Sequence, residues 1–400
     1  MHSKFVLFLS VLVFTGCNSL RSQQENIVRK DFDFASKQLL VAVSEVEKAK
    51  QNAIPGKVSP RTLNADGGLQ LVASRDWTSG FFPGSLWYMY EYTNNDEWKE
   101  LAKKYTAPIE PEKMNGGDHD IGFKLYCSFG NGYRLTKDPS YRSILIQAAK
   151  TLTTRFKSNA GIIRSWDHNT GKWQCPVIID NMMNLELLFW AFKETRDSVY
   201  YQIAVSHAKK TIENHFRKDY SSYHVVDYDT ITGEVLKKNT HQGYAHETAW
   251  ARGQAWGMYG YTMCFRETGD TAYLEQAKAI THFIFTNKNL PEDLIPYWDF
   301  DAPGIPDEPR DVSAAAICAS ALYELSLYDT ENAIQYRQWA DAILDNLSRD
   351  YRSPLNENRG FLLLHSTGIK PMNIEIDVPL SYADYYFLEA LLRKQKMKSR

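Results

Sequence analysis

Residues 195–200 read TRDSVY, and the same pattern recurs as TKDPSY at 136–141 and as TGDTAY at 268–273. A variant, TNNDEW, occupies 93–98, and a looser fifth copy runs from 329 to 336. Each copy lies between an aromatic-rich apolar segment and a more polar segment with helical periodicity, such as YRSILIQAAK. The pattern predicts a tight turn between two helices, in which Asp or Thr caps the second helix and the aromatic residue packs back across the turn.

The turns divide the chain into roughly twelve helices, or six pairs, and strand-like alternation is scarce. Because apolar and amphipathic helices alternate, we expect an all-α fold, a closed (α/α)6 toroid or six-hairpin barrel, with an open solenoid of helical hairpins as the alternative. The expected helices cover 26–51, 79–92, 95–108, 119–135, 139–157, 180–195, 198–215, 247–267, 270–287, 311–327, 331–349 and 379–395.

The composition is that of a folded, nearly neutral protein. Of 400 residues, 44% are apolar and 13% are aromatic, which suffices for a large core and excludes disorder as the main state. The 46 basic and 48 acidic side chains are mixed along the chain, so no nucleic-acid partner is indicated.

Neither a metal site nor a disulfide framework is predicted. Cys127, Cys175, Cys264 and Cys318 lie in apolar surroundings without CxxC spacing, and we expect them to be buried thiols. The HE pair at 246–247 begins like a metalloprotease motif, but Trp250 stands where the second histidine is required.

The N-terminus predicts export. Residues 1–16 contain a basic residue followed by an apolar run and are expected to be a lipoprotein signal peptide. FTGC at 14–17 resembles a lipobox, at which signal peptidase cuts and Cys17 is acylated. Residues 17–25 would form a tether, and residues 26–395 a single domain. We therefore expect a protein of the bacterial envelope, lipid-anchored to a membrane, with a soluble periplasmic protein as the alternative.

The long connections predict the position of the site. If the short turns share one end of a toroid, the long connections crowd the other, and most of the chemically active side chains lie in them or at the starts of the helices that follow. Aromatic residues interleaved with carboxylates and amides are typical of a sugar pocket. These connections are 52–78, 158–179, 216–246, 288–310 and 350–378.

Asp180 is unusual because it lies within VIIDNMMNLELLFWAF, residues 177–192, one of the most apolar stretches of the chain. Apolar walls would raise its pKa, whereas the N-terminus of a helix would lower it, and the sequence leaves both open. A capping role without catalysis is the simplest alternative for Asp120, Asp180 and Asp311.

Five motifs resemble those of the unsaturated glucuronyl hydrolases, glycoside hydrolase family 88. They are HDIGF at 119–123, IIDNMMN at 178–184, THQGY at 240–244, AWARGQAW at 249–256 and DVSAAA at 311–316. The resemblance runs from the first helix to about residue 390. It implies a six-hairpin toroid that works without metal or organic cofactor. It also implies removal of the Δ4,5-unsaturated uronic acid from the non-reducing end of oligosaccharides that polysaccharide lyases release from glycosaminoglycans of chondroitin, hyaluronan or heparin type.

The resemblance also implies the roles of individual residues. Asp180 would be the catalytic acid and Asp120 the second essential aspartate. Trp77 would stack on the unsaturated sugar, and a short S-x-x-x-K element, Ser366 to Lys370, would accommodate a sulfate. The residues expected to surround the sugar are His224, Gln242, Arg252 and Trp256. A structural ion pair is the alternative role for Arg252.

The reaction implied is hydration of a vinyl ether. Protonation at C4 leaves an oxocarbenium ion, water adds at C5, and the hemiketal opens and releases the neighbouring sugar. Asp180 would donate the proton and then activate the water, which requires a pKa near the ambient pH. We expect Asp120 to raise that pKa by repulsion and to have a lowered pKa itself. An unsaturated rhamnogalacturonyl hydrolase acting on pectin fragments, or a glycan-binding lipoprotein without catalysis, are the alternatives.

Overall fold

The computed structural model describes residues 6–52 and 55–397, and of residues 6–26 and 52 only the backbone. All side chains of the predicted signal peptide and tether, including that of Cys17, therefore lie outside what the structure describes. Among the described residues, no helix is both long and apolar enough to cross a membrane.

Six inner helical segments form a closed ring. Each contacts the next, and the last, α12, contacts the first, α2, so the ring has no free edge. The predicted toroid is confirmed, and the open solenoid is wrong. The inner segments are α2 (Phe81–Thr93), η2 (Gly122–Gly130) continued by α4 (Asn131–Thr136), α6 (Leu185–Thr195), α8 (Ala251–Thr268), α10 (Val312–Leu325) and α12 (Ser381–Met397).

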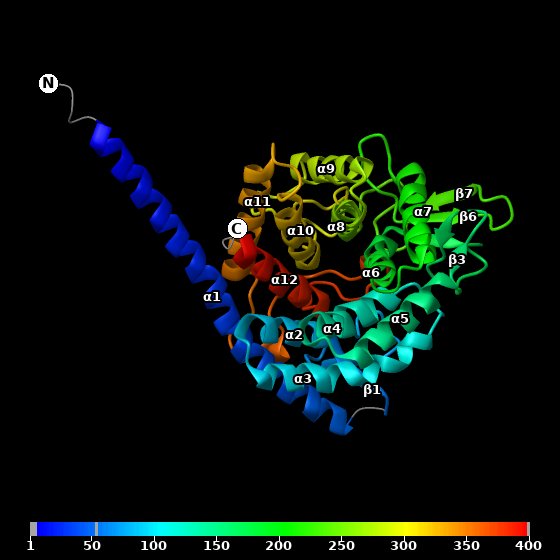
Figure 1. Cartoon of the computed structure of the whole chain (residues 1–400), viewed down its shortest axis with the longest axis horizontal. Coiled ribbons are helices and arrows are strands. Elements are labelled where there is room, and N and C mark those ends of the chain that lie inside the picture. Colours follow the sequence, from blue (N-terminus) through cyan, green and yellow to red (C-terminus); the bar gives the residue numbers. More distant parts are fainter. Residues whose placement is uncertain (1–5, 53–54, 398–400) are drawn as a thin grey trace.

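Each inner segment is covered by one outer helix, as Figure 1 shows for α3, α9 and α11 outside α2, α8 and α10. The last pair joins the two ends of the chain, because α1 packs against α12. The outer helices are α1 (Val6–Asn52), α3 (Asp96–Thr106), α5 (Pro139–Thr153), α7 (Ser198–His215), α9 (Thr271–Thr286) and α11 (Ala333–Asp350).

The repeated turns have one hydrogen-bond pattern. In TRDSVY, the Thr195 hydroxyl donates to the carbonyl of Ala191 and accepts from the N–H of Asp197. The Asp197 carboxylate then accepts from the N–H of Val199 and caps α7. Arg196 between them has a φ of 64°, a left-handed conformation that Gly269 adopts at lower cost in the TGDTAY copy.

Two copies of the turn differ from the prediction. In TNNDEW the side chain that caps α3 belongs to Asn95, not to Asp96, because Asn95 is the residue two positions after the threonine. In the fifth copy Asp329 accepts a hydrogen bond from the Tyr336 hydroxyl, and α11 has no side-chain cap. Only the other copies keep the full Thr-x-Asp pattern.

Short strands, of which the sequence predicted few, lie in the long connections, except that β3 forms the end of the segment predicted as helix 139–157. They are two to seven residues long, too short for a clear alternating pattern. Two hairpins form, and β5, β6 and β7 make a three-stranded antiparallel sheet. The strands are β1 (Lys57–Leu63), β2 (Leu69–Ala73), β3 (Phe156–Lys157), β4 (Ile162–Ile163), β5 (Pro176–Ile178), β6 (Val225–Tyr228) and β7 (Val235–Asn239).

Two inner segments begin with irregular helix. The predicted helix 119–135 starts as the π-helix η2, and the predicted helix 180–195 starts as the 3-10 helix η3, Ile179–Asn184. Asn184 joins them, because its Oδ1 accepts the N–H of Phe123 at 3.0 Å. Irregular turns of this kind are frequent at functional sites. The remaining 3-10 turns are η1 (Ala107–Met114), η4 (Asn358–Gly360) and η5 (Lys370–Met372).

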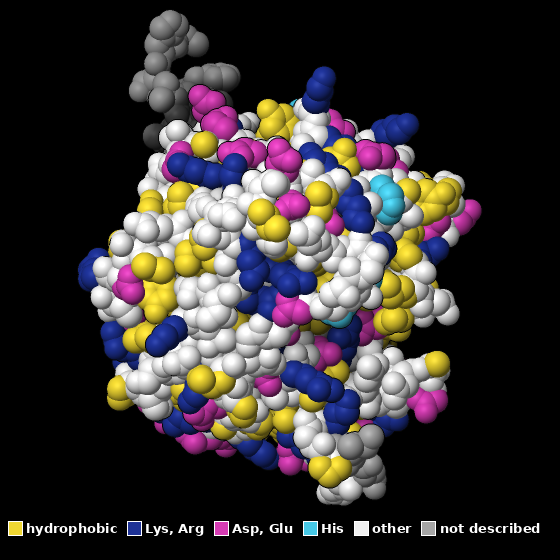
Figure 2. Space-filling model, turned by 90° about the vertical axis from the view of Figure 1, so that its right-hand side faces the viewer, with side chains coloured by type: hydrophobic (Ala, Val, Ile, Leu, Met, Phe, Trp, Pro, Cys, Tyr) yellow, Lys and Arg dark blue, Asp and Glu magenta, His cyan; other side chains and the backbone are white. Residues whose placement is uncertain are grey.

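The main hydrophobic core fills the ring and the space between the two layers of helices. Cys127, Cys175, Cys264 and Cys318 are buried, as predicted. On the face shown in Figure 2, basic, acidic and hydrophobic side chains are interspersed.

Candidate active site

A cavity of about 370 Å³ opens at the end of the toroid that carries the long connections. Its walls come from four of the five predicted connections and from the starts of the inner segments. Five residues predicted for the site line it, namely Trp77, Asp120, Asp180, Gln242 and Arg252. Among the lining residues that the sequence did not single out are Arg61, Arg75, Asp118, Glu375 and Tyr382.

Asp180 is the second residue of η3 and is 7% exposed. The N-cap of η3 is Ile178, so Asp180 is not a helix cap. Burial raises the pKa of Asp180 to about 7, while Arg252, the backbone of Asp180 and Trp256 act in the opposite direction. Desolvation therefore outweighs the helix N-terminus, and the carboxyl group can hold a proton near neutral pH.

Asp120 lies two residues before the start of η2, and its side chain is 19% exposed and lines the cavity. Loss of water raises the pKa of Asp120 well above its ordinary value, and repulsion from Asp118, Asp180 and Asp76 adds to this. Lys124 opposes the shift, but its ammonium group lies 3.0 Å from the carboxylate of Asp118. The prediction of a lowered pKa for Asp120 was wrong because it ignored burial and these further carboxylates.

His224 lies behind Asp180 and is fully buried. Its Nδ1 accepts the backbone N–H groups of His241 and Gln242, both at 3.1 Å, so the ring proton is on Nε2. Nε2 is 3.7 Å from Oδ2 of Asp180. Burial lowers the pKa of His224 well below its usual value, with His241 and Arg252 adding to the effect. His224 is therefore a neutral donor directed toward Asp180, and it also anchors the loop that carries Gln242.

Arg252 lines the cavity, but its two Nη atoms are already occupied. Nη1 lies 2.5 Å from the carboxylate of Asp311 and donates to the carbonyl of Thr367, and Nη2 donates to the carbonyl of Gly368. Nε has no hydrogen-bond partner within the described residues. The structural ion pair considered from the sequence is thus present, and Arg252 also attaches residues 367–368 to the cavity wall.

Asp311 behaves as the capping alternative predicted. Its carboxylate accepts the N–H of Ser313 and caps α10, while its other oxygen pairs with Arg252. Asp311 is therefore a structural partner of the site.

The two predicted tryptophans lie at different depths. Trp77 is partly exposed, lines the cavity and contacts Tyr382 at a ring distance of 4.8 Å. Trp256 is fully buried between Phe123 and Tyr386. Trp77 can therefore present a face to a sugar ring, whereas Trp256 lies in the layer beneath the cavity.

The S-x-x-x-K element lies beside the cavity, but neither Ser366 nor Lys370 lines it. Ser366 is fully buried, and the ammonium group of Lys370 lies 3.1 Å from the carboxylate of Glu308. Gly368 and Ile369, between them, form part of the wall.

Most charges around the cavity are paired. Arg61 contacts the carboxylates of both Glu375 and Asp76, in addition to the Lys124–Asp118 and Arg252–Asp311 pairs. Arg75 is exposed, lines the cavity and has no ion pair within the described residues. This difference between the arginines could not be predicted from the sequence, because the partners of Arg61 and Arg252 are distant in the chain. Arg75 is thus the lining guanidinium best able to meet an anionic group.

No group of three or more His, Cys, Asp and Glu side chains in the described part of the chain is arranged to hold a metal ion.

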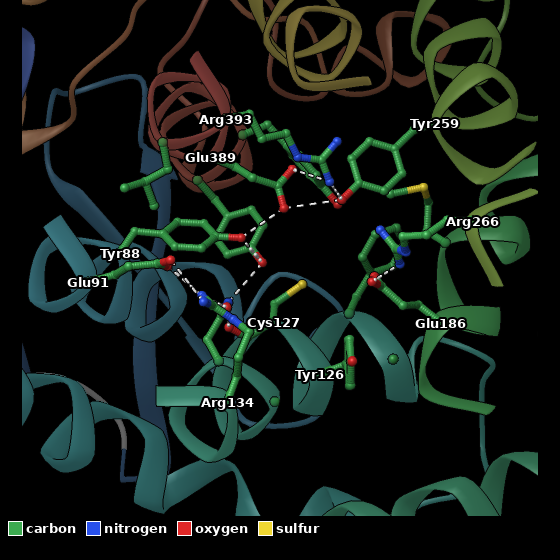
Figure 3. Close-up of a pocket in the computed structure, with 18 of the residues that line it drawn as sticks. Tyr88, Glu91, Tyr126, Cys127, Arg134, Glu186, Tyr259, Arg266, Glu389 and Arg393 are labelled. Carbon is green, nitrogen blue, oxygen red and sulfur yellow. Dashed lines mark hydrogen bonds and ion pairs between the residues drawn. The ribbon is translucent and has the colours of Figure 1, made fainter. Parts of the chain in front are cut away.

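A second cavity of about 270 Å³ is lined by Phe123 and Tyr386, the two residues that pack on Trp256 beneath the first cavity. Its charged side chains form ion pairs and hydrogen bonds with neighbouring residues of the same cavity. Glu389 of α12 accepts hydrogen bonds from the hydroxyls of Tyr88 in α2 and Tyr259 in α8, and Arg266 pairs with Glu186 (Figure 3). This network ties inner helices together and offers no carboxyl group comparable to Asp180.

Buried aspartic acids at the mouth of an α/α toroid, beside a stacking tryptophan, define a class of acid–base enzymes that act on sugars. The chain belongs to Glycosyl Hydrolase Family 88, whose model matches residues 57–323. It is 46% identical over 399 residues to an unsaturated glucuronyl hydrolase of Formosa agariphila, covering 98% of this chain and 99% of that protein.

Solved structures agree with this membership. An unsaturated glucuronyl hydrolase specific for heparin superimposes with a TM-score of 0.88 at 47% identity, covering 94% of this chain and 99% of that one. A mutant unsaturated glucuronyl hydrolase of Streptococcus agalactiae, complexed with dGlcA-GalNAc6S, has a TM-score of 0.76 at 29% identity, covering 92% and 90% of the two chains.

Proposed function

We propose that this protein removes the Δ4,5-unsaturated uronic acid from the non-reducing end of lyase-generated glycosaminoglycan oligosaccharides. The observation that carries the proposal is the Asp180 carboxyl group, which lines the cavity and whose pKa burial raises to about 7. Such a group can donate a proton near neutral pH and can accept one afterwards.

The reaction follows from the polarity of the substrate's C4=C5 bond, which is a vinyl ether. Asp180 protonates C4, and the ring oxygen shares the positive charge that develops at C5. The Asp180 carboxylate then accepts a proton from water as the water oxygen bonds to C5. The resulting hemiketal opens, the bond to the neighbouring sugar breaks, and a keto acid is left. The glycosidic carbon is never attacked, so the separation of the two aspartates does not predict inversion or retention.

The other residues of the site have supporting roles in this scheme. His224 holds its Nε2–H 3.7 Å from Oδ2 of Asp180, where it can stabilise the carboxylate that forms after proton transfer. Trp77 supplies the flat face for the sugar ring, and Arg75 supplies a cation for an acidic group of the substrate. Asp120 orients the water or the sugar hydroxyls.

The export and position of the protein form a separate proposal based on the sequence. We propose that residues 1–16 are removed, that Cys17 is acylated, and that the enzyme acts in the bacterial envelope after polysaccharide lyases have cut the polymer. Cell fractionation of the Cys17→Ser variant tests the anchor, because the variant should leave the membrane fraction while keeping its activity.

Activity is tested by the ultraviolet absorbance of the conjugated C4=C5 bond, which disappears on hydration. Unsaturated disaccharides from chondroitin, hyaluronan, heparin and pectin are supplied to the wild-type protein and to Asp180→Asn. We expect absorbance to decay on at least one glycosaminoglycan disaccharide with wild type only. Decay on the pectin disaccharide alone would identify a rhamnogalacturonyl hydrolase, and no decay on any of them would contradict the enzyme function.

A further inference from the structure

A buried histidine stands beside the second aspartate of the site. His119 is 1% exposed, and its Nε2 is 3.2 Å from Oδ1 of Asp120. His119 is part of the HDIGF motif, but no role was predicted for it from the sequence. A polar ring with so little access to water needs partners, and these define its orientation.

Ser165 holds the other edge of the ring. The N–H of His119 donates to the carbonyl of Ser165, and the Ser165 hydroxyl lies 3.4 Å from Nδ1 of His119. The same hydroxyl accepts the N–H of Ile178, so its own proton is free to be donated to Nδ1. With Nδ1 as acceptor, the ring proton of a neutral imidazole is on Nε2, toward Asp120.

The imidazole is uncharged at any working pH. Burial lowers the pKa of His119 to about 3. Asp118 and a hydrogen bond with the side chain of Asn181 act against this, while Arg155 and Lys124 add to it. A neutral N–H donor can stabilise the ionised form of Asp120 without adding a positive charge beside Asp180. The groups that also act on Asp120 are Asp118, Asp180, Asp76 and Lys124.

We infer that His119 is a positioning residue, whose Nε2–H orients the Asp120 carboxyl group and favours its ionised form. The inference rests on the proposed function for the role of Asp120 in turnover. His224 has the same relation to Asp180, since its Nδ1 is also occupied and its Nε2 also faces a carboxyl oxygen. Each of the two aspartates thus has a neutral imidazole beside it, at 3.2 Å for Asp120 and at 3.7 Å for Asp180.

Replacing His119 by glutamine or by asparagine distinguishes the role of its Nε2 from that of its Nδ1. The side-chain nitrogen of glutamine reaches the position of Nε2, and that of asparagine reaches the position of Nδ1. Both remove the ring, so loss of packing is common to them and thermal unfolding of the two variants serves as the control. We expect His119→Gln to keep kcat within about tenfold of wild type and His119→Asn to lose about 100-fold, with little change in KM. If His119→Asn were the more active, the ring would serve Ser165 and the inference would be wrong.

A titration that does not depend on turnover completes the test. In the Asp180→Asn background, the carboxyl carbon signal of Asp120 is assigned by its loss in Asp120→Asn and followed against pH by NMR. Loss of a donor raises the pKa of a carboxyl group, so adding His119→Asn should move the midpoint to higher pH by about one unit, whereas His119→Gln should not. An unchanged midpoint in both would overturn the inference. If wild type hydrates no substrate, the proposed function fails while this titration still decides the role of His119.

Discussion

The Nε2 atom of His224 lies 3.7 Å from Oδ2 of Asp180, and neither atom has a hydrogen-bond partner within the described residues. Buried polar atoms without partners are uncommon in folded proteins. Two residues that line the cavity, Arg252 and Tyr382, also carry such an atom, which offers a donor to a substrate oxygen or to water. The neighbouring atoms with the same property are Nε1 of Trp250 and Trp256, Nε of Arg252 and the hydroxyl of Tyr382.

Asp180→Asn should abolish turnover and leave folding intact. The amide keeps the size of the side chain but has no carboxylic acid proton, so we expect kcat to fall by at least about 1000-fold. Disaccharide binding, measured by calorimetry, should persist. Retained activity with a lowered melting temperature would show that Asp180 is structural.

Asp384→Asn is the matched control for this substitution. Asp384 is also buried, and burial raises its pKa to about 8, but it accepts the N–H groups of Leu362 and Leu363 and does not line the cavity. We expect this variant to lose stability, since one buried acceptor is removed, and to keep the kcat of wild type.

The raised pKa of Asp180 also predicts how stability depends on pH. The pKa is about 7 in the folded protein and 3.8 for the ordinary group, so between these values the folded state holds a proton that the unfolded state has released. The free energy of unfolding should therefore fall as pH rises through this window, by up to about 4 kcal/mol from this group. Urea unfolding at about pH 5 and pH 8 should show Asp180→Asn gaining stability relative to wild type at the higher pH. An equal difference at both values would exclude the linkage.

The turns and helices were predictable because their causes are local. Thr195 and Asp197 form the cap of α7 within the turn, Tyr200 is buried, and the same pattern recurs along the chain. Periodicity then located the helices, whereas the contact between α12 and α2 decided between the closed ring and the open solenoid. The π-helix at 122–130 was missed because it depends on a contact with Asn184, which is far away in sequence.

The site was predictable as a set of residues but not as a set of charges. The motifs brought Asp120 and Asp180 to one cavity, yet the pKa of each depends on burial that no local pattern reveals. Arg252 was expected to bind the substrate. It lines the cavity, but Asp311 and the carbonyls of residues 367–368 already accept hydrogen bonds from its Nη atoms. Long-range pairing of this kind decides which cations remain free.

His224→Ala should loosen the loop that carries Gln242. Nδ1 of His224 accepts hydrogen bonds from the backbone N–H groups of His241 and Gln242. Without this acceptor, both amides should exchange with solvent faster. Hydrogen exchange followed by NMR or mass spectrometry measures the effect, with His282→Ala on the exposed side of α9 as the control. Unchanged exchange at 241–242 would mean that the loop is held elsewhere, for example by Asp299 through the N–H of Tyr244.

Arg75→Gln should weaken substrate binding without slowing the chemical step. Arg75 lines the cavity and has no ion pair within the described residues, so its guanidinium is available to an acidic or sulfated sugar. Because the side chain is exposed, the contact is modest, and we expect KM to rise about fivefold with kcat unchanged. The difference should shrink at high salt, where exposed charges are screened. Arg196→Gln is the matched control, an exposed arginine in the turn before α7, and should leave KM unchanged. Equal KM values for wild type and Arg75→Gln at low salt would mean that the anionic group of the substrate is bound by another residue.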